Sequence, residues 1–416
     1  MHLCLFEDTL AKNFLPLTAL RPVYDLRCGM LSMRQRIVGC LRPSALTLLT
    51  RNYLEPLVSE QNPGVKVNAL GADSFLLING RCIMSPEAAK TLKKGGDDCV
   101  FIAAGEVAAA RLGAGTRSRL ALASTENGMD VSLLMSLPHV ELDVSMVRYP
   151  WDLVHVDESV YENDFRLLTR RGVNRKGDIH PSAVLLGKKN IHIGEKSRVD
   201  PGVVIMAEQG GVFIDGGVRV WPNVVIEGPC HIGEGTVIKS GARIYGHTSI
   251  GPVCKVGGEV EHSILHARAN KQHDGFLGHS YLGEWVNLGA GTSTSNLKNT
   301  YGNIRMNIGG AMVDTGKMFL GLVSGDHVKT GINMSIDTGT FIGTASALYG
   351  SKLPPKTVPS FTWGDGDNLT EYPYDKAVSV ASKVMARRGI QMSAAYSEAF
   401  RSVFTATEHE RTNIRK

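Results

Sequence analysis

The 416-residue sequence has few features of a secreted, membrane or nucleic-acid-binding protein. Its seven cysteines are scattered and form no C-x-x-C pair, which argues against a disulfide framework and against a zinc knuckle. No apolar run approaches the roughly 20 residues that cross a bilayer, and acids follow the first short apolar run too closely for a signal peptide. The net charge of +5 includes no basic block. We therefore expect a cytoplasmic protein that binds small molecules and contacts neither membrane nor nucleic acid.

Aromatic residues are also scarce, at 6%, whereas 46 residues are glycine, and this combination is typical of tight turns or of a repeat. A repeat is present, because aliphatic residues recur at every sixth position. The matching residues are Ile214, Val220, Ile226, Ile232, Ile238, Ile244, Ile250 and Val256, preceded by Ile193, Val199 and Ile205 and followed later by Ile336, Ile342 and Leu348. This spacing predicts a left-handed parallel β-helix of hexapeptide repeats, a triangular prism with aliphatic side chains inside. A glycine-rich β-sandwich with accidental spacing does not account for eight consecutive matches.

Between Val256 and Ile336 the hexads are interrupted. Nine ionisable residues gather at the start of this stretch: Glu259, Glu261, His262, His266, Arg268, Lys271, His273, Asp274 and His279. Interruptions of a repeat are where functional residues commonly collect. We therefore expect a binding or catalytic site here, although each charge taken singly is equally typical of a solvated loop.

The string Leu-Gly-x3-Leu-Gly-x-x-Val-Asn-Leu-Gly-Ala-Gly-Thr-x-Thr-x-Asn occupies Leu277 to Asn296. It resembles the acetyltransferase half of the bifunctional UDP-N-acetylglucosamine pyrophosphorylase and glucosamine-1-phosphate N-acetyltransferase family, in its alternative bacterial branch. The resemblance implies acetyl transfer from acetyl-CoA to the amine of glucosamine 1-phosphate. His273 would be the general base, and Asn287 would donate a hydrogen bond to the developing oxyanion.

The same resemblance assigns further contacts. Asn296 and Phe276 would lie at the acceptor sugar, and Gly289, Ala290 and Gly350 would lie at acetyl-CoA. Phe276 replaces a family tyrosine. The family's phosphate-binding lysine falls near Glu261 and His262, so we expect Lys298, Arg305 or Lys317 to supply that charge.

Two alternatives remain for this region. His273 could be a polar loop residue without chemistry. The histidines could instead bind zinc between subunits, as in trimeric β-helix carbonic anhydrases, although the asparagine-rich string fits acetyl transfer better. Prisms of this family commonly form homotrimers with active sites between neighbours, and we expect the same assembly here.

The N-terminal part alternates strand-like and helical segments, which predicts a Rossmann-like α/β domain. Apolar strands are expected at 3–6, 46–49, 75–78 and 100–103, and helices at 29–41, 86–93 and 105–111. In such a fold the ligand lies at the carboxyl ends of the strands. A Gly-x-Gly-Thr-Arg string at 113–117 follows the expected helix 105–111, so we interpret it as a turn and not as a nucleotide loop.

The segment Leu15-Pro16-Leu17-Thr18-x3-Pro22 resembles the start of sugar-nucleotide pyrophosphorylases. Their glycine-rich triphosphate loop is missing, because this chain has Leu-Ala-Lys-Asn-Phe at 10–14. Lys12, Arg21 and Arg27 could bind the phosphates of UTP instead. Alternatively, the two arginines are structural and pair with Asp25 or with the sheet edge.

Leu-Leu-Ile-Asn-Gly-Arg at 76–81 is similar to the family strand that ends in Asn-Gly-Asp, whose aspartate holds Mg²⁺. Asn79 would contact the substrate, but Arg81 stands in place of the aspartate. Asp157 could provide a Mg²⁺ ligand, or it could cap a helix.

We therefore predict a nucleotidyltransferase-like domain at 1–165, a linker at 166–178, a β-helix at 179–353 and a helical tail at 354–416. The resemblance implies an enzyme that makes UDP-N-acetylglucosamine: the β-helix acetylates glucosamine 1-phosphate and the N-terminal domain transfers uridylyl from UTP. We expect Mg²⁺ to take part in the uridylyl transfer. Two alternatives are a nucleotidyltransferase for another sugar 1-phosphate with a structural β-helix, and an acetyltransferase with a silent sugar-nucleotide-binding domain.

Overall fold

The computed structural model describes residues 1–71, 74–119, 124–412 and 414. The chain forms two compact units, which are described separately. The first contains Met1–Leu26, Leu31–Tyr149 and Ser393–Ser402, and the second contains Arg27–Met30, Pro150–Met392 and Val403–Lys416. Among the described residues, no helix is both long enough and apolar enough to span a membrane.

The first unit is built on a seven-stranded sheet with the order β12-β8-β9-β6-β1-β4-β5. Its strands are β1 (His2–Phe6), β4 (Ala45–Leu48), β5 (Lys66–Val67), β6 (Phe75–Asn79), β8 (Cys99–Ala103), β9 (Glu106–Leu112) and β12 (His139–Glu141). All neighbours pair in parallel except β9, which runs antiparallel to β6 and β8. The expected α/β domain and its four apolar strands are confirmed.

Helices of the first unit begin at sequence-encoded caps. The helix α1 (Met33–Leu41) starts with a capping box in which Ser32 and Gln35 bond each other's backbone N–H. The helix α3 (Pro86–Lys93) follows Ser85, whose hydroxyl accepts from the N–H of Ala88. The remaining α-helices of this unit are α2 (Glu55–Gln61) and α4 (Ala114–Arg119).

One helix prediction in this unit is wrong. Residues expected to form a helix at 105–111 form the strand β9, which lies between β6 and β8. The alanines Ala108, Ala109 and Ala110 are buried there, because small side chains fit the tightly packed faces of a central strand. Tertiary pairing therefore overrides the high helix propensity of alanine.

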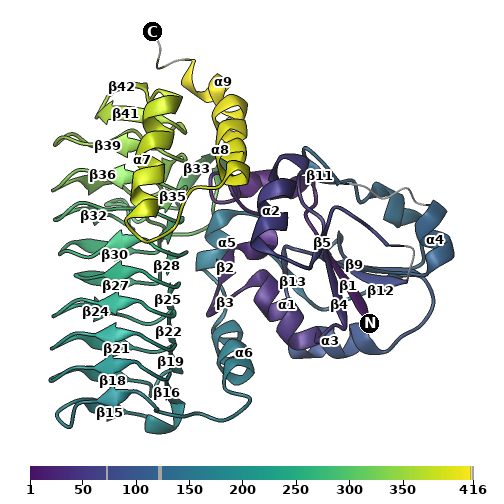
Figure 1. The fold of residues 1–416 in the computed structure, drawn as a ribbon, viewed down its shortest axis with the longest axis horizontal. Helices are drawn as coiled ribbons and strands as arrows, with labels where there is room; N and C mark the ends of the chain where they lie inside the picture. The colour runs from purple at the N-terminus through teal and green to yellow at the C-terminus, as the bar shows by residue number, and fades with distance from the viewer. Residues whose placement is uncertain (72–73, 120–123, 413, 415–416) are drawn as a thin grey trace. The chain divides into compact units, whose positions relative to one another are not determined.

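The second unit contains the predicted left-handed parallel β-helix, whose coils lie one above another in Figure 1. Three faces recur in each coil. The first face has β14 (Asp178–Ile179), β17 (Arg198–Val199), β20 (Arg219–Val220), β23 (Val237–Ile238), β26 (Lys255–Val256) and β29 (Asn270–Lys271), continued by β36 (Lys329–Thr330), β39 (Ala347–Leu348), β41 (Thr362–Asp365) and β42 (Asn368–Glu371).

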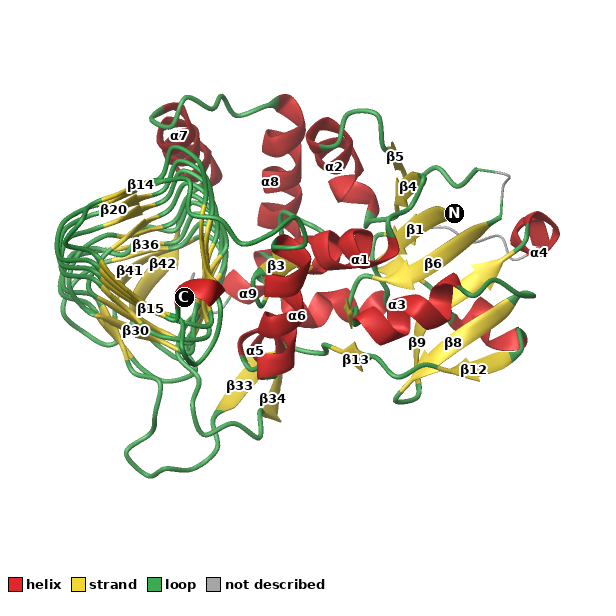
Figure 2. Cartoon of the chain, turned by 90° about the horizontal axis from the view of Figure 1, so that it is seen from below, coloured by secondary structure: helices red, strands yellow, loops and turns green. Residues whose placement is uncertain are grey.

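The second face has β15 (Val184–Leu186), β18 (Val204–Met206), β21 (Val225–Glu227), β24 (Arg243–Ile244), β27 (Glu259–Glu261) and β30 (Phe276–Gly278), continued by the pair β32 (Ser293–Thr294) and β37 (Ser335–Ile336). The third face has β16 (Ile191–Ile193), β19 (Val212–Ile214), β22 (Cys230–Ile232), β25 (Thr248–Ile250), β28 (Ile264–Leu265), β31 (Tyr281–Leu282), β35 (Val323–Ser324), β38 (Phe341–Ile342) and β40 (Thr357–Val358). Figure 2 shows the coils end-on as a closed outline.

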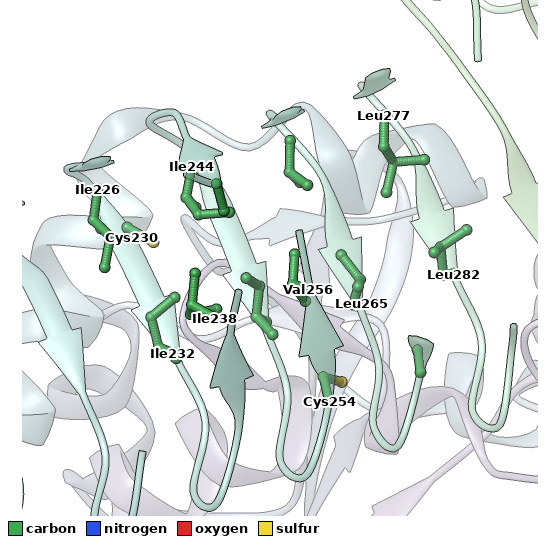
Figure 3. Packing of buried hydrophobic residues seen from close by; sticks show 14 of the residues in the cluster. Ile226, Cys230, Ile232, Ile238, Ile244, Cys254, Val256, Leu265, Leu277 and Leu282 are labelled. Carbon is green, nitrogen blue, oxygen red and sulfur yellow. The ribbon is translucent and has the colours of Figure 1, made fainter. Parts of the chain in front are cut away.

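The hexad residues form the core of the prism. Every aliphatic residue of the predicted repeat belongs to one buried cluster, and each is at most 3% exposed. Figure 3 shows Ile226, Ile232, Ile238 and Ile244 pointing inward from successive strands. At about 25 cal/mol per Å² of buried apolar surface, this stacking is the main stabilising contribution to the prism.

The coils also continue through the stretch where the hexad spacing fails. Val256 is followed at an interval of four residues by Val260, and then by Leu265, Leu277 and Leu282, all in the same core. The strands keep their pairing, since β27 pairs with β30 and β28 pairs with β31. Shortened corners therefore change the sequence spacing while the ladders stay in register.

Helices complete the second unit. The helices α5 (Pro150–Val154) and α6 (Glu158–Leu168) precede the prism, and α7 (Tyr374–Ala386), α8 (Ala394–Ala406) and α9 (Glu408–Arg411) follow it, with α8 crossing from the first unit to the second. A helical C-terminal region is confirmed, although β40, β41 and β42 lie inside the range predicted for the tail, and the helices begin at Tyr374. A long loop after β32 carries the hairpin β33 (Arg305–Ile308) and β34 (Ala311–Asp314).

Candidate active site

The predicted base His273 lies at the corner between the first and second faces of the prism. Its side chain is exposed, and it lines a hollow of about 410 Å³ together with Lys239, Asp274 and Ala290. Trp221, Ser240, Gly257, Gly258, Gln272 and Gly291 complete the lining. The corner thus joins an imidazole, an ammonium group and the backbone that the resemblance assigns to acetyl-CoA.

A buried lysine supports this corner from inside the prism. Lys271 occupies the inward position that Val256 occupies one coil earlier, and it is only 2% exposed. Its Nζ donates a hydrogen bond of 2.6 Å to the carbonyl oxygen of His273. Burial lowers the pKa of Lys271 to about 8, although Asp274 and Glu259 partly oppose this shift.

Glycine is required next to this ammonium group. Gly258 has a φ of +69°, and a Cβ at that position would come within 2.8 Å of Lys271 Nζ and of the His273 carbonyl oxygen. Residue 258 therefore has to lack a side chain for the lysine to reach the corner.

Asn287 lies on the outer row of the first face, between Asn270 and Lys329. Its backbone N–H donates to the carbonyl of Val328, and the side chain is half-buried. Asn287 does not line the hollow around His273. Gly289 directly precedes Ala290 at the corner, and a side chain on it would collide with the carbonyl of Gly331.

The predicted acceptor residues Phe276 and Asn296 gather around Gly278 at a different corner, between the second and third faces. A Cβ on Gly278 would meet the ring of Phe276 and the Nδ2 of Asn296. Asn296 Nδ2 lies 2.9 Å from His279 Nδ1. These residues therefore do not share the hollow with His273 within one chain.

Lys298 and Gly350 lie elsewhere. Lys298 belongs to the loop after β32, where its Nζ donates to the carbonyl oxygen of Asn303. Gly350 has a φ of +86° and packs against the carboxylate of Asp365, which leaves no room for a side chain. Neither residue lines the hollow at His273.

Sequence reasoning missed a column of stacked histidines at the corner that carries Asn296. The rings of His247 and His262, and those of His262 and His279, lie 4.6 Å apart in stacked pairs, and His279 stacks on Phe319. Burial, reinforced by the neighbouring histidines, lowers the pKa of His262 to about 4 and that of His279 to about 3. The column is therefore neutral at physiological pH.

A sequence signal for this column was available, because His247, His262 and His279 each shortly precede a strand of the third face in consecutive coils. In the described part of the chain, no group of three or more histidine, cysteine or acidic residues is arranged to hold a metal ion. Stacked rings are not arranged to coordinate one metal ion together.

The carboxyl ends of β1 and β6 in the first unit are closed by ion pairs. Arg81 is 1% exposed and binds Asp8 at 2.5 Å and Glu106 at 2.5 Å. Asn79 Nδ2 donates to Asp8 at 2.9 Å and to the carbonyl of Val107 at 3.0 Å. The predicted substrate contact of Asn79 is thus occupied by internal partners.

A second ion pair lies beside the first. Glu7 accepts from the backbone N–H of Val23, from Thr50 and from Arg51, which is buried. No local motif predicts these pairs, because Arg51 is 44 residues from Glu7 and Arg81 is 73 residues from Asp8, and the partners meet only at the strand ends.

The predicted phosphate ligands of this domain are dispersed. Lys12 is exposed in the short 3₁₀ helix Thr9–Phe14, and Arg21 is buried with its Nη1 donating to the carbonyl of Leu17. Arg27 belongs to the second unit, where its backbone N–H donates to the Tyr281 hydroxyl and its guanidinium contacts His231 and the Met30 carbonyl. These contacts favour the structural alternative for Arg27.

The donor set at these strand ends does not fit Mg²⁺. Both carboxylate oxygens of Asp8 accept from Arg81, and an arginine stands where a metal-binding aspartate would be needed. Asp157 belongs to the second unit, is exposed and forms the N-cap of α6 without a side-chain capping bond.

The Gly-x-Gly-Thr-Arg string at 113–117 follows the strand β9 and not a helix, contrary to the expected context, and its last four residues begin the helix α4. It nevertheless lies at the opposite edge of the sheet, because β9 is antiparallel to its neighbours. The N–H of Gly113 donates to Asp98 at 2.6 Å. A carboxylate of the chain itself thus occupies the position where a phosphate would bind.

Comparisons with known proteins agree with this two-part architecture. Residues 3–172 match the family model of sugar nucleotidyl transferases, and residues 211–246 match that of bacterial transferase hexapeptide repeats. Two separate parts of the chain are thus similar to two families of transferases. Both matched families are families of transferases, so the prediction that the chain has an enzyme's architecture is confirmed.

Curated relatives include proteins that are named as bifunctional. The chain is 32% identical over 150 residues to the bifunctional sugar-1-phosphate nucleotidylyltransferase/acetyltransferase of Sulfurisphaera tokodaii, covering 33% of this chain and 37% of the relative. It is 33% identical over 120 residues to the bifunctional protein GlmU of Rippkaea orientalis, covering 28% and 25%. The matches thus span about a quarter to two fifths of these relatives' length.

Among solved structures, the UDP-N-acetylglucosamine acyltransferase of Francisella novicida is similar over 53% of this chain and 72% of its own. The identity is 16% and the TM-score is 0.29.

Proposed function

We propose that the prism transfers an acetyl group from acetyl-CoA to the amine of glucosamine 1-phosphate. The observation that carries this proposal is the hollow in which His273, Lys239 and the Ala290 backbone meet. His273 would remove the proton from the amine as the amine nitrogen attacks the thioester carbonyl. The C–N bond forms, the C–S bond breaks, and CoA leaves as the thiol after taking up a proton.

The distribution of the predicted residues supports assembly as a homotrimer. Phe276 and Asn296 lie at one corner and His273 at another, so one chain does not gather all of them. Neighbouring prisms would bring these corners together. Light scattering should then give a mass three times the 44.9 kDa of the chain.

Purified protein should release CoA when supplied with acetyl-CoA and glucosamine 1-phosphate. His273→Ala should lower kcat by about a hundredfold, the usual contribution of a general base. His180→Ala, at an exposed histidine of the first coil, is the matched control and should leave kcat unchanged. Full activity of His273→Ala would refute the assigned base.

We further propose that the first unit transfers uridylyl from UTP to N-acetylglucosamine 1-phosphate, releasing pyrophosphate. The match of residues 3–172 to sugar nucleotidyl transferases supports this half. Both donors are cytoplasmic metabolites, and we place the reactions there. The test is pyrophosphate release with UTP, with and without Mg²⁺.

One observation favours a second candidate for this unit, a catalytically silent sugar-nucleotide-binding module. The arginines and acids at the ends of β1, β4 and β6 neutralise one another and leave no matched Mg²⁺ ligand set. Calorimetry with UDP-N-acetylglucosamine distinguishes the candidates, because binding without turnover at any Mg²⁺ concentration identifies the silent module.

A further inference from the structure

A group of cations on the first face of the prism has no acidic partner. Lys239, Lys255, Arg387 and Arg388 take part in no ion pair within the described ranges of the chain. Like charges held together on a surface repel one another, and bound anions relieve that repulsion. The four residues, here called the basic cluster, therefore need an explanation.

Strand register places two of these residues on neighbouring coils. Val237 of β23 pairs with Lys255 of β26, and Lys239 directly follows β23. Lys255 in turn pairs with Asn270 of β29.

The end of α7 contributes the other two charges. Arg388 donates through Nη2 to Asn270 Oδ1 at 2.8 Å and through Nη1 to the Val253 carbonyl at 3.3 Å. These two hydrogen bonds fix its guanidinium on the same face as Lys255. Arg388 first, and then burial, Lys239 and Arg387, hold the pKa of Lys255 below its usual value, which agrees with this proximity.

The basic cluster is continuous with the hollow at His273. Lys239 belongs to both, and its Nζ lies 3.6 Å from the centroid of the Trp221 ring. The aromatic face orients the ammonium group at the wall of the hollow. A phosphate held by the cluster would thus belong to a ligand that also reaches the imidazole.

We infer that Lys239, Lys255, Arg387 and Arg388 form a phosphate-binding site that holds a phosphorylated substrate beside His273. The identity of that substrate rests on the proposed acetyl transfer, whereas the phosphate chemistry rests on the cluster itself. Two substrates of the proposed reaction carry phosphate: the acceptor, as its 1-phosphate, and the donor, in the nucleotide part of acetyl-CoA.

Calorimetric titration of the full-length protein tests the site with three probes: glucosamine 1-phosphate, CoA and dephospho-CoA, which lacks the 3′-phosphate. The variant Lys255→Gln, alone and combined with Arg387→Gln, removes charge from exposed or half-exposed positions. Lys189→Gln, at an exposed lysine of the first coil, is the matched control. Circular dichroism verifies that each variant is folded.

We expect the double variant to bind the relevant probe about tenfold more weakly, because charge-assisted bonds to phosphate are lost, while Lys189→Gln binds as the wild type does. A loss confined to glucosamine 1-phosphate assigns the site to the acceptor. A loss for CoA that dephospho-CoA does not show assigns it to the 3′-phosphate of the donor, and equal losses for both assign it to the diphosphate.

Unchanged affinity for all three probes, or no binding of any of them by the wild type, would overturn the inference. Wild-type CoA release is measured in parallel. If the double variant still releases CoA with both KM values unchanged, the phosphate site is refuted and the proposed acetyl transfer stands. If the wild type binds phosphate but releases no CoA, and the double variant loses this binding, the acetyl transfer is refuted and the phosphate site stands.

Discussion

A single charged side chain inside the prism distinguishes the coil that carries His273. Lys271 takes the place of an inward aliphatic residue, and its Nζ donates a hydrogen bond to the carbonyl oxygen of His273. Burying an ammonium group is unfavourable, so its presence indicates a role that an aliphatic residue does not fill. We interpret Lys271 as a positioning residue for the corner.

Replacing Lys271 tests this role. Lys271→Met should preserve or raise the thermal midpoint, because a buried charge is replaced by an apolar chain of similar length. It should lower kcat about tenfold with little change in KM, since the His273 corner loses its support. Steady-state CoA release gives both parameters.

Lys329→Met is the matched control for this prediction. Burial also lowers the pKa of Lys329 to about 8, and its Nζ donates to the His327 carbonyl, not to His273. An equal fall in kcat for both variants would mean that Lys271 contributes only to the general structure of the prism.

Asp8 is the residue on which the closed strand ends of the first unit depend. Asp8→Asn should lower the free energy of unfolding by about 3 kcal/mol, because the buried Arg81 loses a carboxylate partner. Urea denaturation measures the change. Asp143→Asn, at an exposed aspartate of the same unit, should change stability by less than about 0.5 kcal/mol.

At the scale of elements, the histidine column makes the prism sensitive to acid. The folded pKa values of His262 and His279, about 4 and about 3, lie below the unfolded value of about 6.5. The unfolded chain therefore binds more protons in this range. The contribution of these two neutral histidines to the free energy of unfolding is fully present above about pH 6.5. It is lost as the pH falls through 4 towards 3.

The double variant His262→Gln, His279→Gln should show a weaker acid dependence. Its thermal midpoint should fall less than that of the wild type between pH 6.5 and 4, with about two fewer protons taken up on unfolding. Calorimetry at several pH values measures this slope. His180→Gln should keep the wild-type slope, and an unaltered slope in the double variant would contradict the assigned pKa shifts.

The sequence predicted elements wherever local pattern and tertiary packing agree. The hexads identified the inward residues, and the apolar runs identified the strands of the first unit. The prediction failed at β9, where alanines fit a helix and a crowded central strand equally well. The hexad spacing alone does not show which residues point inward between Val256 and Ile336, because shortened corners change the spacing without breaking the ladders.

The candidate site was predictable only in part, for a related reason. His273 and Ala290 lie close in sequence to a long matching string, and the structure brings them into one hollow. Lys239 lies 34 residues before His273 in the sequence, and Asp8 lies 73 residues before Arg81. Contacts of that kind depend on the register of coils and strands, which no local motif encodes.

At the scale of the whole molecule, the two proposed reactions belong to different units. Lys12 and Asn79 lie in the first unit, whereas His273 and Asn287 lie in the second. We therefore expect His273→Ala to lower CoA release about a hundredfold and to leave pyrophosphate release unchanged. Lys12→Ala should lower pyrophosphate release about tenfold and leave CoA release unchanged, because it removes a charge that we propose to bind the phosphates of UTP.

Both activities are measured on the same preparation, so each variant serves as the control for the other. A parallel loss of both activities in His273→Ala would show that the two reactions depend on each other.

The in-register ladders of the prism also define a step of growth. Val212 pairs with Cys230 and Cys230 with Thr248, so successive coils here are separated by 18 residues. Duplication or loss of one such coil would preserve every ladder and shift the rest of the prism by about 4.8 Å, whereas removal of one residue within a strand would turn inward side chains outward. Related proteins can therefore differ in length by whole coils. Such a change would move the His273 corner along the prism axis without altering the arrangement of its residues.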